Sequence, residues 1–232
     1  MLSFIIPAWN EEELIGQTIE SIHAAATDLK YEIIVANDAS DDRTAEIAES
    51  MGATVVHCNN RQIGLTRNDG AKVSSGEWIV FVDADTLVSS DVVRETIDAF
   101  NSGAISGTSF PMFDEEIPFT ARVLTPVLRV SFRVLRLAAG AYMFCTKEAF
   151  DAVGGFDKKF FAAEEVHLSR SLHKQGPFKT INSRVVTSGR KFRTFSSVVM
   201  LVTLVMINIP GVRGIRKRPK LWYGERKKQI DD

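Results

Sequence analysis

The two carboxylates of Asp83-Ala84-Asp85 are the residues of this sequence whose types and spacing most directly suggest chemistry. They follow residues 77–82, an apolar run that is typical of a buried strand. If the strand continues through the motif, both carboxylates point to the same side and can face one cation. Such hard oxygen ligands suit Mg²⁺ or Mn²⁺, which keep positions open for phosphate oxygens. The alternative is a turn or helix cap after the strand, where aspartate is common.

Two further polar segments follow apolar runs earlier in the chain. In residues 7–11 (PAWNE) the Trp9 ring could stack on a nucleobase, and the alternative is a loop in which Asn10 caps the next helix. In residues 37–42 (NDASDD) one carboxylate could accept hydrogen bonds from a base or a ribose. The alternative there is that Ser40 or Asp41 caps the following helix.

Short apolar runs alternate with segments of helical periodicity through the first hundred residues, and this alternation must position the polar segments. Strands are predicted over residues 3–8, 31–36, 54–57 and 77–82. Helices are predicted over residues 11–26, 40–50, 63–73 and 89–100, the last capped by Ser89 or Ser90. The alternation predicts an α/β fold built from βαβ units with a parallel sheet. Right-handed crossovers then bring the acidic loops together at the carboxyl ends of the strands.

The second half of the chain has a less regular pattern. Strands are predicted over residues 105–110, 142–146 and 185–187. Helices are predicted over residues 119–139, with Pro126 as a kink, and over 164–175 and 197–209, followed by a basic tail at 213–228.

The charges are segregated along the chain. Residues 1–116 contain 6 Lys and Arg against 21 Asp and Glu, whereas residues 117–232 contain 22 against 8. This asymmetry predicts that the two regions meet different partners. At 45% hydrophobic and 25% charged residues, the composition is that of a folded protein and excludes a disordered chain.

The cysteine count and the apolar runs bear on location. Two cysteines, Cys58 and Cys145, cannot form a disulfide scaffold or a four-cysteine zinc site, and we expect buried thiols in a reducing compartment. The longest apolar run, residues 198–209, is too short to span a bilayer, and no signal peptide is expected. The sequence therefore predicts a cytoplasmic protein, with peripheral contact at the inner face of the cell membrane as an option.

The predicted helix at 119–139 is basic and amphipathic. At 100° per residue Arg122, Arg129, Arg133 and Arg136 fall within an arc of about 60°, and the remaining faces are largely apolar. Such a helix could lie on an anionic membrane surface or flank a lipid-linked acceptor. The alternatives are a core-facing helix with a solvated arginine stripe, or a homodimer interface. The apolar run 198–209 with its following cations repeats the pattern, and no nucleic-acid recognition motif accompanies the charge.

Several motifs, in their order and spacing, resemble the inverting family 2 of nucleotide-sugar glycosyltransferases, which has the GT-A fold. Together they cover roughly residues 1–190, and several motifs in one order are more specific than any single one. The motifs are residues 4–12 (FIIPAWNEE), 35–44 (VANDASDDRT), 64–71 (GLTRNDGA), 75–78 (SGEW), 82–86 (VDADT), 154–157 (GGFD) and 164–170 (EEVHLSR).

This resemblance implies a central, mostly parallel mixed sheet flanked by helices, a UDP- or GDP-sugar donor, and Mg²⁺ or Mn²⁺ as cofactor. It implies donor-binding positions, with Asp38 at the base or ribose and Arg67 near the diphosphate. The donor-binding positions are Pro7, Trp9, Glu11, Asp38, Arg67, Asp83, Ala84 and, beyond the acidic pair, Arg190 and Lys191.

The same resemblance implies the metal ligands and the catalytic base. Asp85 would bind the metal directly together with Asp83, and Glu165 would be the base, with Glu164 as the alternative. The family commonly has Glu-Asp at 164–165, so the base here would be a glutamate. Acidic residues at a helix start are also favoured by the helix dipole, which offers a structural interpretation for one of the two glutamates.

The predicted organisation is a GT-A domain at 1–195, with a donor half at 1–116 and an acceptor half at 117–195, followed by an apolar helix and basic tail at 196–232. The predicted function is metal-dependent, inverting transfer of a sugar to an acceptor hydroxyl, on an acceptor that could be lipid-linked or a cell-envelope glycan. The alternatives are a nucleotidyltransferase-like enzyme and a non-catalytic protein that binds a membrane surface or a partner. The first would normally have a glycine-rich loop after the first strand, and residues 7–13 contain none.

Overall fold

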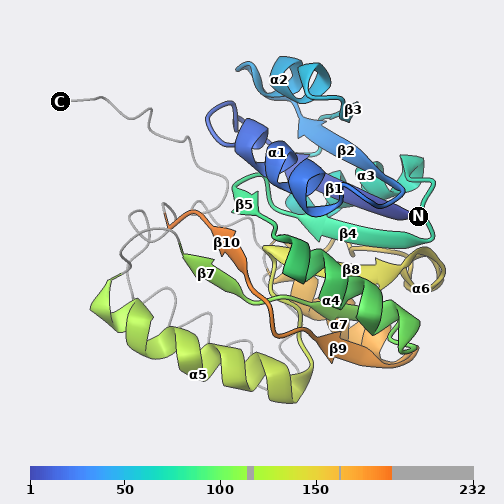
Figure 1. Cartoon of the computed structure of the whole chain (residues 1–232), viewed down its shortest axis with the longest axis vertical. Coiled ribbons are helices and arrows are strands. Elements are labelled where there is room, and N and C mark those ends of the chain that lie inside the picture. The colour runs from blue at the N-terminus through green and yellow to red at the C-terminus, as the bar shows by residue number, and fades with distance from the viewer. Residues whose placement is uncertain (114–117, 162, 190–232) are drawn as a thin grey trace.

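A seven-stranded mixed sheet organises the computed structural model, which describes residues 1–113, 118–161 and 163–189 (Figure 1). The strand order is β3-β2-β1-β4-β8-β6-β9. Strands β3, β2, β1 and β4 are parallel, whereas β8 is antiparallel to both of its neighbours, β4 and β6. The strands are β1 (Leu2–Ala8), β2 (Tyr31–Asp38), β3 (Thr54–Cys58), β4 (Trp78–Val82), β6 (Ser106–Thr108), β8 (Tyr142–Thr146) and β9 (Phe178–Thr180). The predicted α/β class with a mostly parallel mixed sheet is confirmed.

Helices cover both faces of this sheet. Helices α1 (Ile15–Ala25) and α4 (Ser90–Asn101) pack on one face, and α2 (Thr44–Ser50) packs against α1 and β3. Helices α3 (Ile63–Val73), α6 (Lys147–Val153) and α7 (Glu164–His173) cover the other face. The molecule therefore has three layers in which the central strands are enclosed, which explains why their sequences are continuous apolar runs.

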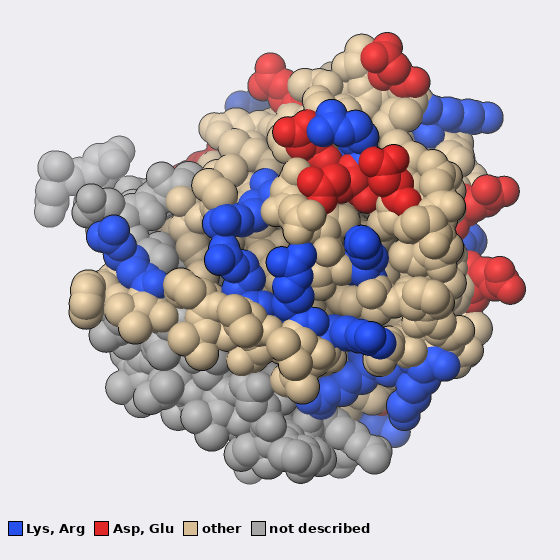
Figure 2. All heavy atoms as spheres, turned by 60° about the horizontal axis from the view of Figure 1, so that its bottom comes forward, with Lys and Arg blue, Asp and Glu red and all other residues tan. Residues whose placement is uncertain are grey.

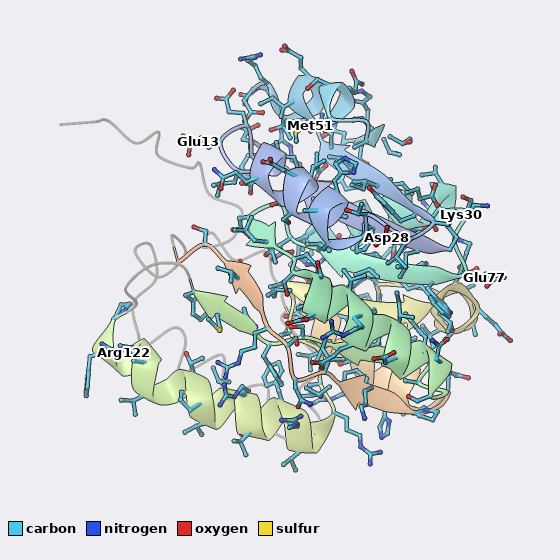
Figure 3. All side chains as sticks on the ribbon, in the orientation of Figure 1. Glu13, Asp28, Lys30, Met51, Glu77 and Arg122 are labelled. Atoms are coloured by element: carbon cyan, nitrogen blue, oxygen red, sulfur yellow. The ribbon has the colours of Figure 1, made fainter. Side chains whose placement is uncertain are left out.

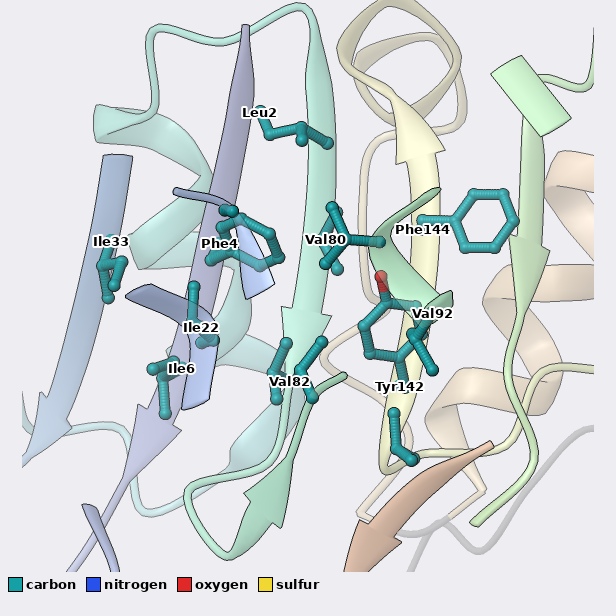
Figure 4. Packing of buried hydrophobic residues seen from close by; sticks show 14 of the residues in the cluster. Leu2, Phe4, Ile6, Ile22, Ile33, Val80, Val82, Val92, Tyr142 and Phe144 are labelled. Carbon is teal, nitrogen blue, oxygen red and sulfur yellow. The ribbon is translucent and has the colours of Figure 1, made fainter. Parts of the chain in front are cut away.

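The alternation of side chains along the central strands divides the core into two parts. Phe4 and Ile6 of β1 face the α1 and α4 side, together with Val80 and Val82 of β4, as the close view of the packing shows (Figure 4). Ile5 points to the α3, α6 and α7 side. Because successive side chains of a strand point to opposite faces, the register of β1 fixes which loop residues emerge at its carboxyl end.

A smaller three-stranded sheet lies beside the main sheet. It has the order β5-β10-β7, with β5 at Thr86–Leu87, β7 at Pro111–Phe113 and β10 at Val185–Thr187. Helix α5 (Phe119–Leu135) lies outside the helical layers, near β7 and β10 in Figure 1. No helix within the described ranges is long and apolar enough to cross a membrane.

Several local predictions need correction. The strand predicted at 105–110 is the shorter β6, and β5, β7, β9 and α6 were not predicted. Helix α5 ends at Leu135 rather than at residue 139, because Arg136 turns into the left-handed region with a φ of 54°. Cys145 is buried as expected, but Cys58 is only half-buried at the edge strand β3. Ser89 caps α4 as predicted, accepting a hydrogen bond from the Val92 amide.

Candidate active site at the carboxyl edge of the sheet

The loops after β1 and β2 are joined to each other by hydrogen bonds. Asn10 Nδ2 donates to Asp41 Oδ1 at 2.6 Å, and the Asp41 amide donates back to Asn10 Oδ1 at 3.0 Å. The Asn10 amide donates to Ser40 Oγ at 3.0 Å. Both loops turn through left-handed residues, Asn10 at a φ of 53° and Ala39 at 54°. The prediction that Asn10 caps a helix starting at residue 11 is therefore wrong, since this side chain cross-links the loops and α1 begins only at Ile15.

Helix α2 also begins later than predicted. Neither Ser40 nor Asp41 caps it; instead Asp42 Oδ1 accepts a hydrogen bond from the Thr44 amide at 3.0 Å. The Thr44 hydroxyl in turn accepts from the Glu11 amide at 2.8 Å, and Glu11 is only 6% exposed. Pro7, opposite Ala36 in the β1–β2 register, lies just before this cross-linked region. The first two loops thus form one preorganised unit at the sheet edge.

Asp38 ends β2 and is held by the loop that leads into α3. Its Oδ1 accepts from the Asn60 amide at 2.6 Å and from the Arg61 amide at 3.0 Å. The Arg61 guanidinium lies 5.0 Å from the centroid of the Trp9 ring, a cation–π arrangement. Trp9, Asp38 and Arg61 therefore come together from three segments, and Arg61 is a site residue that the sequence analysis missed.

The Asp83-Ala84-Asp85 motif forms a turn and does not continue the strand. Strand β4 ends at Val82, and the Thr86 amide donates to the Asp83 carbonyl at 3.1 Å. The expectation that both carboxylates share one face of an extended strand is therefore wrong. Asp85 Oδ1 accepts from the Thr187 hydroxyl at 3.2 Å, and the Ala84 carbonyl accepts from the Thr18 hydroxyl at 2.8 Å. These two bonds attach the turn to β10 and to α1.

Arg67 joins this turn to the second half of the chain. It comes from α3, is 2% exposed, and donates from Nη2 to Asp83 Oδ1 at 2.7 Å and from Nη1 to Glu164 Oε1 at 3.0 Å. Nη2 also donates to the Gly140 carbonyl at 3.1 Å. Burial alone would lower the pKa of Arg67, but the charges of Asp83, Glu164 and Glu165 outweigh it and raise that pKa. Arg67 is thus a permanently charged centre between the buried carboxylate of Glu164 and the partly buried carboxylate of Asp83.

The two neighbouring glutamates at the start of α7 have different environments. Glu164 is 5% exposed and forms the ion pair with Arg67. Glu165 is half-buried, and burial together with the charge of Glu164 raises its pKa to about 8, although Arg67 opposes the shift. A carboxyl with a pKa near neutral can take up a proton at physiological pH. Glu164 is therefore held in place by its ion pair with Arg67, whereas Glu165 has a pKa that suits proton transfer.

Asp83 and Asp85 are the residues available for a divalent cation. Within the described ranges no group of three or more His, Cys, Asp or Glu side chains forms a complete protein cage for a metal. Mg²⁺ and similar cations are commonly held by one or two carboxylates plus substrate phosphates, and the two aspartates fit that requirement in number and chemistry. The predicted residues Arg190 and Lys191, and the segment 196–232, lie outside the described residues.

Comparisons with known proteins identify relatives of this sequence. The sequence model of the family described as "Glycosyl transferase family 2" matches residues 3–163. Poly-β-1,6-N-acetyl-D-glucosamine synthase of Staphylococcus aureus is 28% identical over 194 residues, which cover 75% of this chain and 46% of the synthase. The chain spans less than half the length of the curated relatives that it matches.

Solved structures share the fold at lower sequence identity. TarS of S. aureus has a TM-score of 0.65 at 16% identity, covering 91% of this chain and 67% of that one. The mannosyltransferase PcManGT of Pyrobaculum calidifontis, in complex with GDP-Man and Mn²⁺, has a TM-score of 0.67 at 20% identity, covering 82% and 58%. Both are GT-A proteins, so the sheet and its helical layers form a GT-A fold.

Proposed function

The chain belongs to glycosyl transferase family 2, and from that premise we propose that it transfers a sugar from a nucleotide-diphosphate sugar to an acceptor hydroxyl, with inversion. The observation that carries the proposal is the cluster at the carboxyl edge of the sheet. In it Arg67 connects the aspartate turn after β4 to the glutamate pair of α7. A leaving-group site and a base site are the two parts that a single displacement at an anomeric carbon requires.

The donor nucleotide binds at the cross-linked loops after β1 and β2. Trp9, backed by Arg61, offers an aromatic surface for a base, and Asp38 offers carboxylate oxygen to a base or ribose. Pro7 and Glu11 border the same loop. The donor is a UDP- or GDP-sugar, a proposal supported by fold neighbours: TarS has been solved with UDP and with UDP-GlcNAc, and PcManGT with GDP-Man.

Asp85 and Asp83 hold the divalent cation in this proposal, with the Ala84 peptide forming the turn between them. A Mg²⁺ or Mn²⁺ held by Asp85 and Asp83 would neutralise the negative charge that develops on the departing diphosphate. The protein's own contribution is to fix the two carboxylates: Thr187 orients Asp85 and Arg67 orients Asp83. Two of the similar folds, PcManGT and glucosyl-3-phosphoglycerate synthase of Mycobacterium tuberculosis, were solved with Mn²⁺, which supports this assignment.

Glu165 acts as the general base. An acceptor hydroxyl has a high pKa, so its proton must be removed as the oxygen attacks the anomeric carbon, and Glu165 Oε receives it. Glu164 acts through Arg67 as a positioning residue, because its carboxylate is occupied by the ion pair. One base and one displacement invert the anomeric configuration, unlike the two carboxylates of a glycosidase.

The two halves of the chain divide this work in our proposal. Residues 1–116 supply the donor side and residues 117–195 the acceptor side. The acceptor hydroxyl belongs to a lipid-linked or cell-envelope glycan, and the enzyme acts in the cytoplasm at the inner face of the membrane. The excess of Lys and Arg beyond residue 116 supports an acceptor or surface that is anionic.

A thermal-shift screen tests the donor and metal assignments together. UDP and GDP are each added with Mn²⁺, with Mg²⁺ and with EDTA, because a ligand that binds the native state at 100 times its Kd adds about 2.7 kcal/mol of stability. We expect one diphosphate to raise the melting temperature by several degrees, only with metal, and not in Asp85→Ala.

The anomeric proton coupling of the product, followed by NMR from a defined donor, tests inversion. A metal-independent shift would overturn the metal assignment, and retention of configuration would overturn the single displacement.

A further inference from the structure

Helix α5 presents an apolar stripe to the outside of the molecule. The stripe consists of Phe119, Val123, Val127, Val130 and Val134. Each of these side chains is between 54% and 79% exposed. At 100° per residue they fall within an arc of about 80°, so they form one continuous strip along the helix. A contiguous exposed apolar strip of this kind marks an interaction surface.

A different face of α5 packs against the protein. The Phe132 ring lies 6.3 Å from the ring of Phe110, and Phe132 also packs against the small cluster formed by Leu137 and Val166. Phe132 is about 140° or more around the helix from every member of the apolar stripe. The helix is therefore apolar on two faces, and its own packing on the protein leaves the apolar stripe uncovered.

An arginine row borders the apolar stripe on one side. It consists of Arg122, Arg129, Arg133 and the C-cap residue Arg136, and the helix contains no Asp or Glu. Arg122 lies at the N-terminal end of α5, which extends beyond the main sheet (Figure 3). Figure 2, in which α5 comes forward, shows basic side chains gathered along one edge of this helix. Arg133 Nη2 donates to Asn182 Oδ1 at 2.7 Å. Arg136 Nη1 lies within hydrogen-bond distance of His173 Nε2, at 3.3 Å.

We propose that α5 docks on an anionic lipid bilayer, with the apolar stripe in the boundary between headgroups and acyl chains and the arginine row on lipid phosphates. An interfacial helix typically combines an apolar face with a polar face rich in Lys and Arg, and α5 has both and contains no acidic residue that anionic lipid would repel. This surface is independent of the transfer reaction, since none of the apolar stripe belongs to the active-site cluster.

The charge pattern favours lipid as the partner of the apolar stripe over a second copy of this chain or another segment of it. A second copy docked through the same stripe would bring two arginine rows close together, a like-charge contact that costs free energy. The charged parts of residues 190–232, which flank the apolar run 198–209, are also rich in Lys and Arg, so these parts do not complement the arginine row. Lipid phosphates are the complementary partner.

The end of α5 leads directly into the active-site cluster. Arg136 closes the helix, Leu137 and Ala138 are buried, and Gly140 gives its carbonyl to Arg67. The Ala139 amide is fixed by the Thr108 hydroxyl at 3.0 Å. Docking of α5 therefore sets the position of the cluster relative to the bilayer, which suits an acceptor that is itself held in the membrane.

Vesicle flotation of the full chain tests the surface. Vesicles of phosphatidylcholine with and without phosphatidylglycerol are compared for the wild type, for Val127→Glu/Val130→Glu, and for Arg122→Gln/Arg129→Gln. We expect wild-type binding that needs the anionic lipid, and a loss of about tenfold or more in each double variant. Val73→Glu is the matched control, since Val73 is 50% exposed on α3. Binding by Val127→Glu/Val130→Glu equal to that of the wild type, or absence of wild-type binding, would overturn the proposal.

A site-specific probe separates α5 from other membrane contacts of the chain. In a Cys58→Ser background, Val127→Cys labelled with an environment-sensitive dye should brighten on phosphatidylglycerol vesicles, while labelled Val73→Cys should not. A dye that is unchanged at position 127, or a change with protein concentration in the absence of vesicles, overturns the proposal, the second in favour of a homodimer. Vesicle binding without sugar transfer would leave this surface intact and count against the proposed function alone.

Discussion

The carboxyl edge of the main sheet and helix α5 depart from ordinary folding preferences in opposite ways. At the sheet edge, charged groups are inside: Arg67 and Glu164 are almost completely buried. On α5, apolar groups are outside: Val134 is 74% exposed and Phe119 is 79% exposed. Buried charges and exposed apolar side chains both cost stability relative to the reverse arrangement.

The difference between these regions indicates what each is adapted to meet. The sheet edge keeps its charges fixed by hydrogen bonds, so they can act on a charged substrate without rearrangement. Helix α5 keeps its apolar side chains exposed to water until a partner surface, in our proposal a lipid bilayer, covers them. Replacing a charged residue at the sheet edge should therefore lower both sugar transfer and the free energy of unfolding. Replacing an apolar residue of the α5 stripe should weaken docking and leave the free energy of unfolding unchanged.

Asp85→Ala should have the largest effect and would show that the charges of the sheet edge serve chemistry. We expect sugar transfer to fall by about a thousandfold or more, because loss of metal-based charge stabilisation costs several kcal/mol in the transition state. The measurement is kcat/KM for the donor at saturating Mn²⁺. Asp91→Ala is the control, since Asp91 is 62% exposed in a surface ion pair. Full turnover by Asp85→Ala would break the metal assignment.

The two glutamates of α7 should respond differently to the same substitution. Glu165→Gln should lower kcat by roughly 10²–10⁴-fold while diphosphate binding persists, because only the proton acceptor is removed. Glu164→Gln should retain more transfer but lose stability, since it breaks the pair with Arg67. Single-turnover rates and a thermal shift with the diphosphate measure both. If Glu164→Gln stops transfer and Glu165→Gln does not, Glu164 is the general base instead of Glu165.

Arg67→Met tests whether the buried charges depend on each other. Removal of Arg67 leaves the buried Glu164 and the partly buried Asp83 without this partner, and we expect a loss of about 3–5 kcal/mol in the free energy of unfolding. Urea denaturation gives the value. Arg94→Met provides the comparison, because its pair with Asp91 is exposed and should be worth less than about 1 kcal/mol. Equal losses of unfolding free energy in Arg67→Met and Arg94→Met would mean that the buried ion pairs of Arg67 contribute no more to stability than an exposed ion pair.

The raised pKa of Glu165 predicts a pH dependence of both activity and stability. Only deprotonated Glu165 can accept the acceptor proton, so kcat should rise with pH and level off above about 8. The native state holds this proton above the ordinary pKa of 4.5, so its contribution to stability is full below 4.5 and is lost as pH rises through about 8. Glu165→Gln should lose both dependences, as measured by kcat profiles and by denaturation at several pH values.

Val127→Glu should have the smallest effect on the isolated protein. Val127 is 58% exposed, so we expect a change within about 0.5 kcal/mol in the free energy of unfolding. The same substitution at Val80, which is fully buried in β4, should prevent folding because it buries an unpaired carboxylate. Urea denaturation of Val127→Glu and the soluble yield of Val80→Glu measure the contrast. A large loss at Val127 would show that the apolar stripe is covered within the protein itself.

Strong local patterns made most of the main fold predictable. The prediction for α3 is correct from Ile63 to Val73, and that for β8 from Tyr142 to Thr146, because each pattern fills its whole element. Strands β5, β7 and β9 have two or three residues, too few for a period to be recognised, whereas the equally short β10 was predicted because all three of its residues are β-branched. The late start of α1 could not be predicted, since Asn10 pairs with Asp41 from another loop.

The identities of the site residues were more predictable than their contacts. The resemblance to the glycosyltransferase family indicated Asp38, Arg67, Asp85 and Glu165 as site residues, and their roles stay predictions. The pairing of Arg67 with Glu164 joins positions 97 residues apart, and only the fold determines it. Arg61 has no motif, and its place over Trp9 depends on a left-handed backbone with a φ of 49°.

The Arg67 cluster also has a consequence for synthesis of the chain. Arg67 and Asp83 emerge from the ribosome well before Glu164, the second carboxylate that pairs with Arg67. A nascent first half would have to bury Arg67 without Glu164, so its central layer should remain incompletely closed until α7 is made. Final packing of the central layer should therefore wait until both Arg67 and Glu164 have been synthesised.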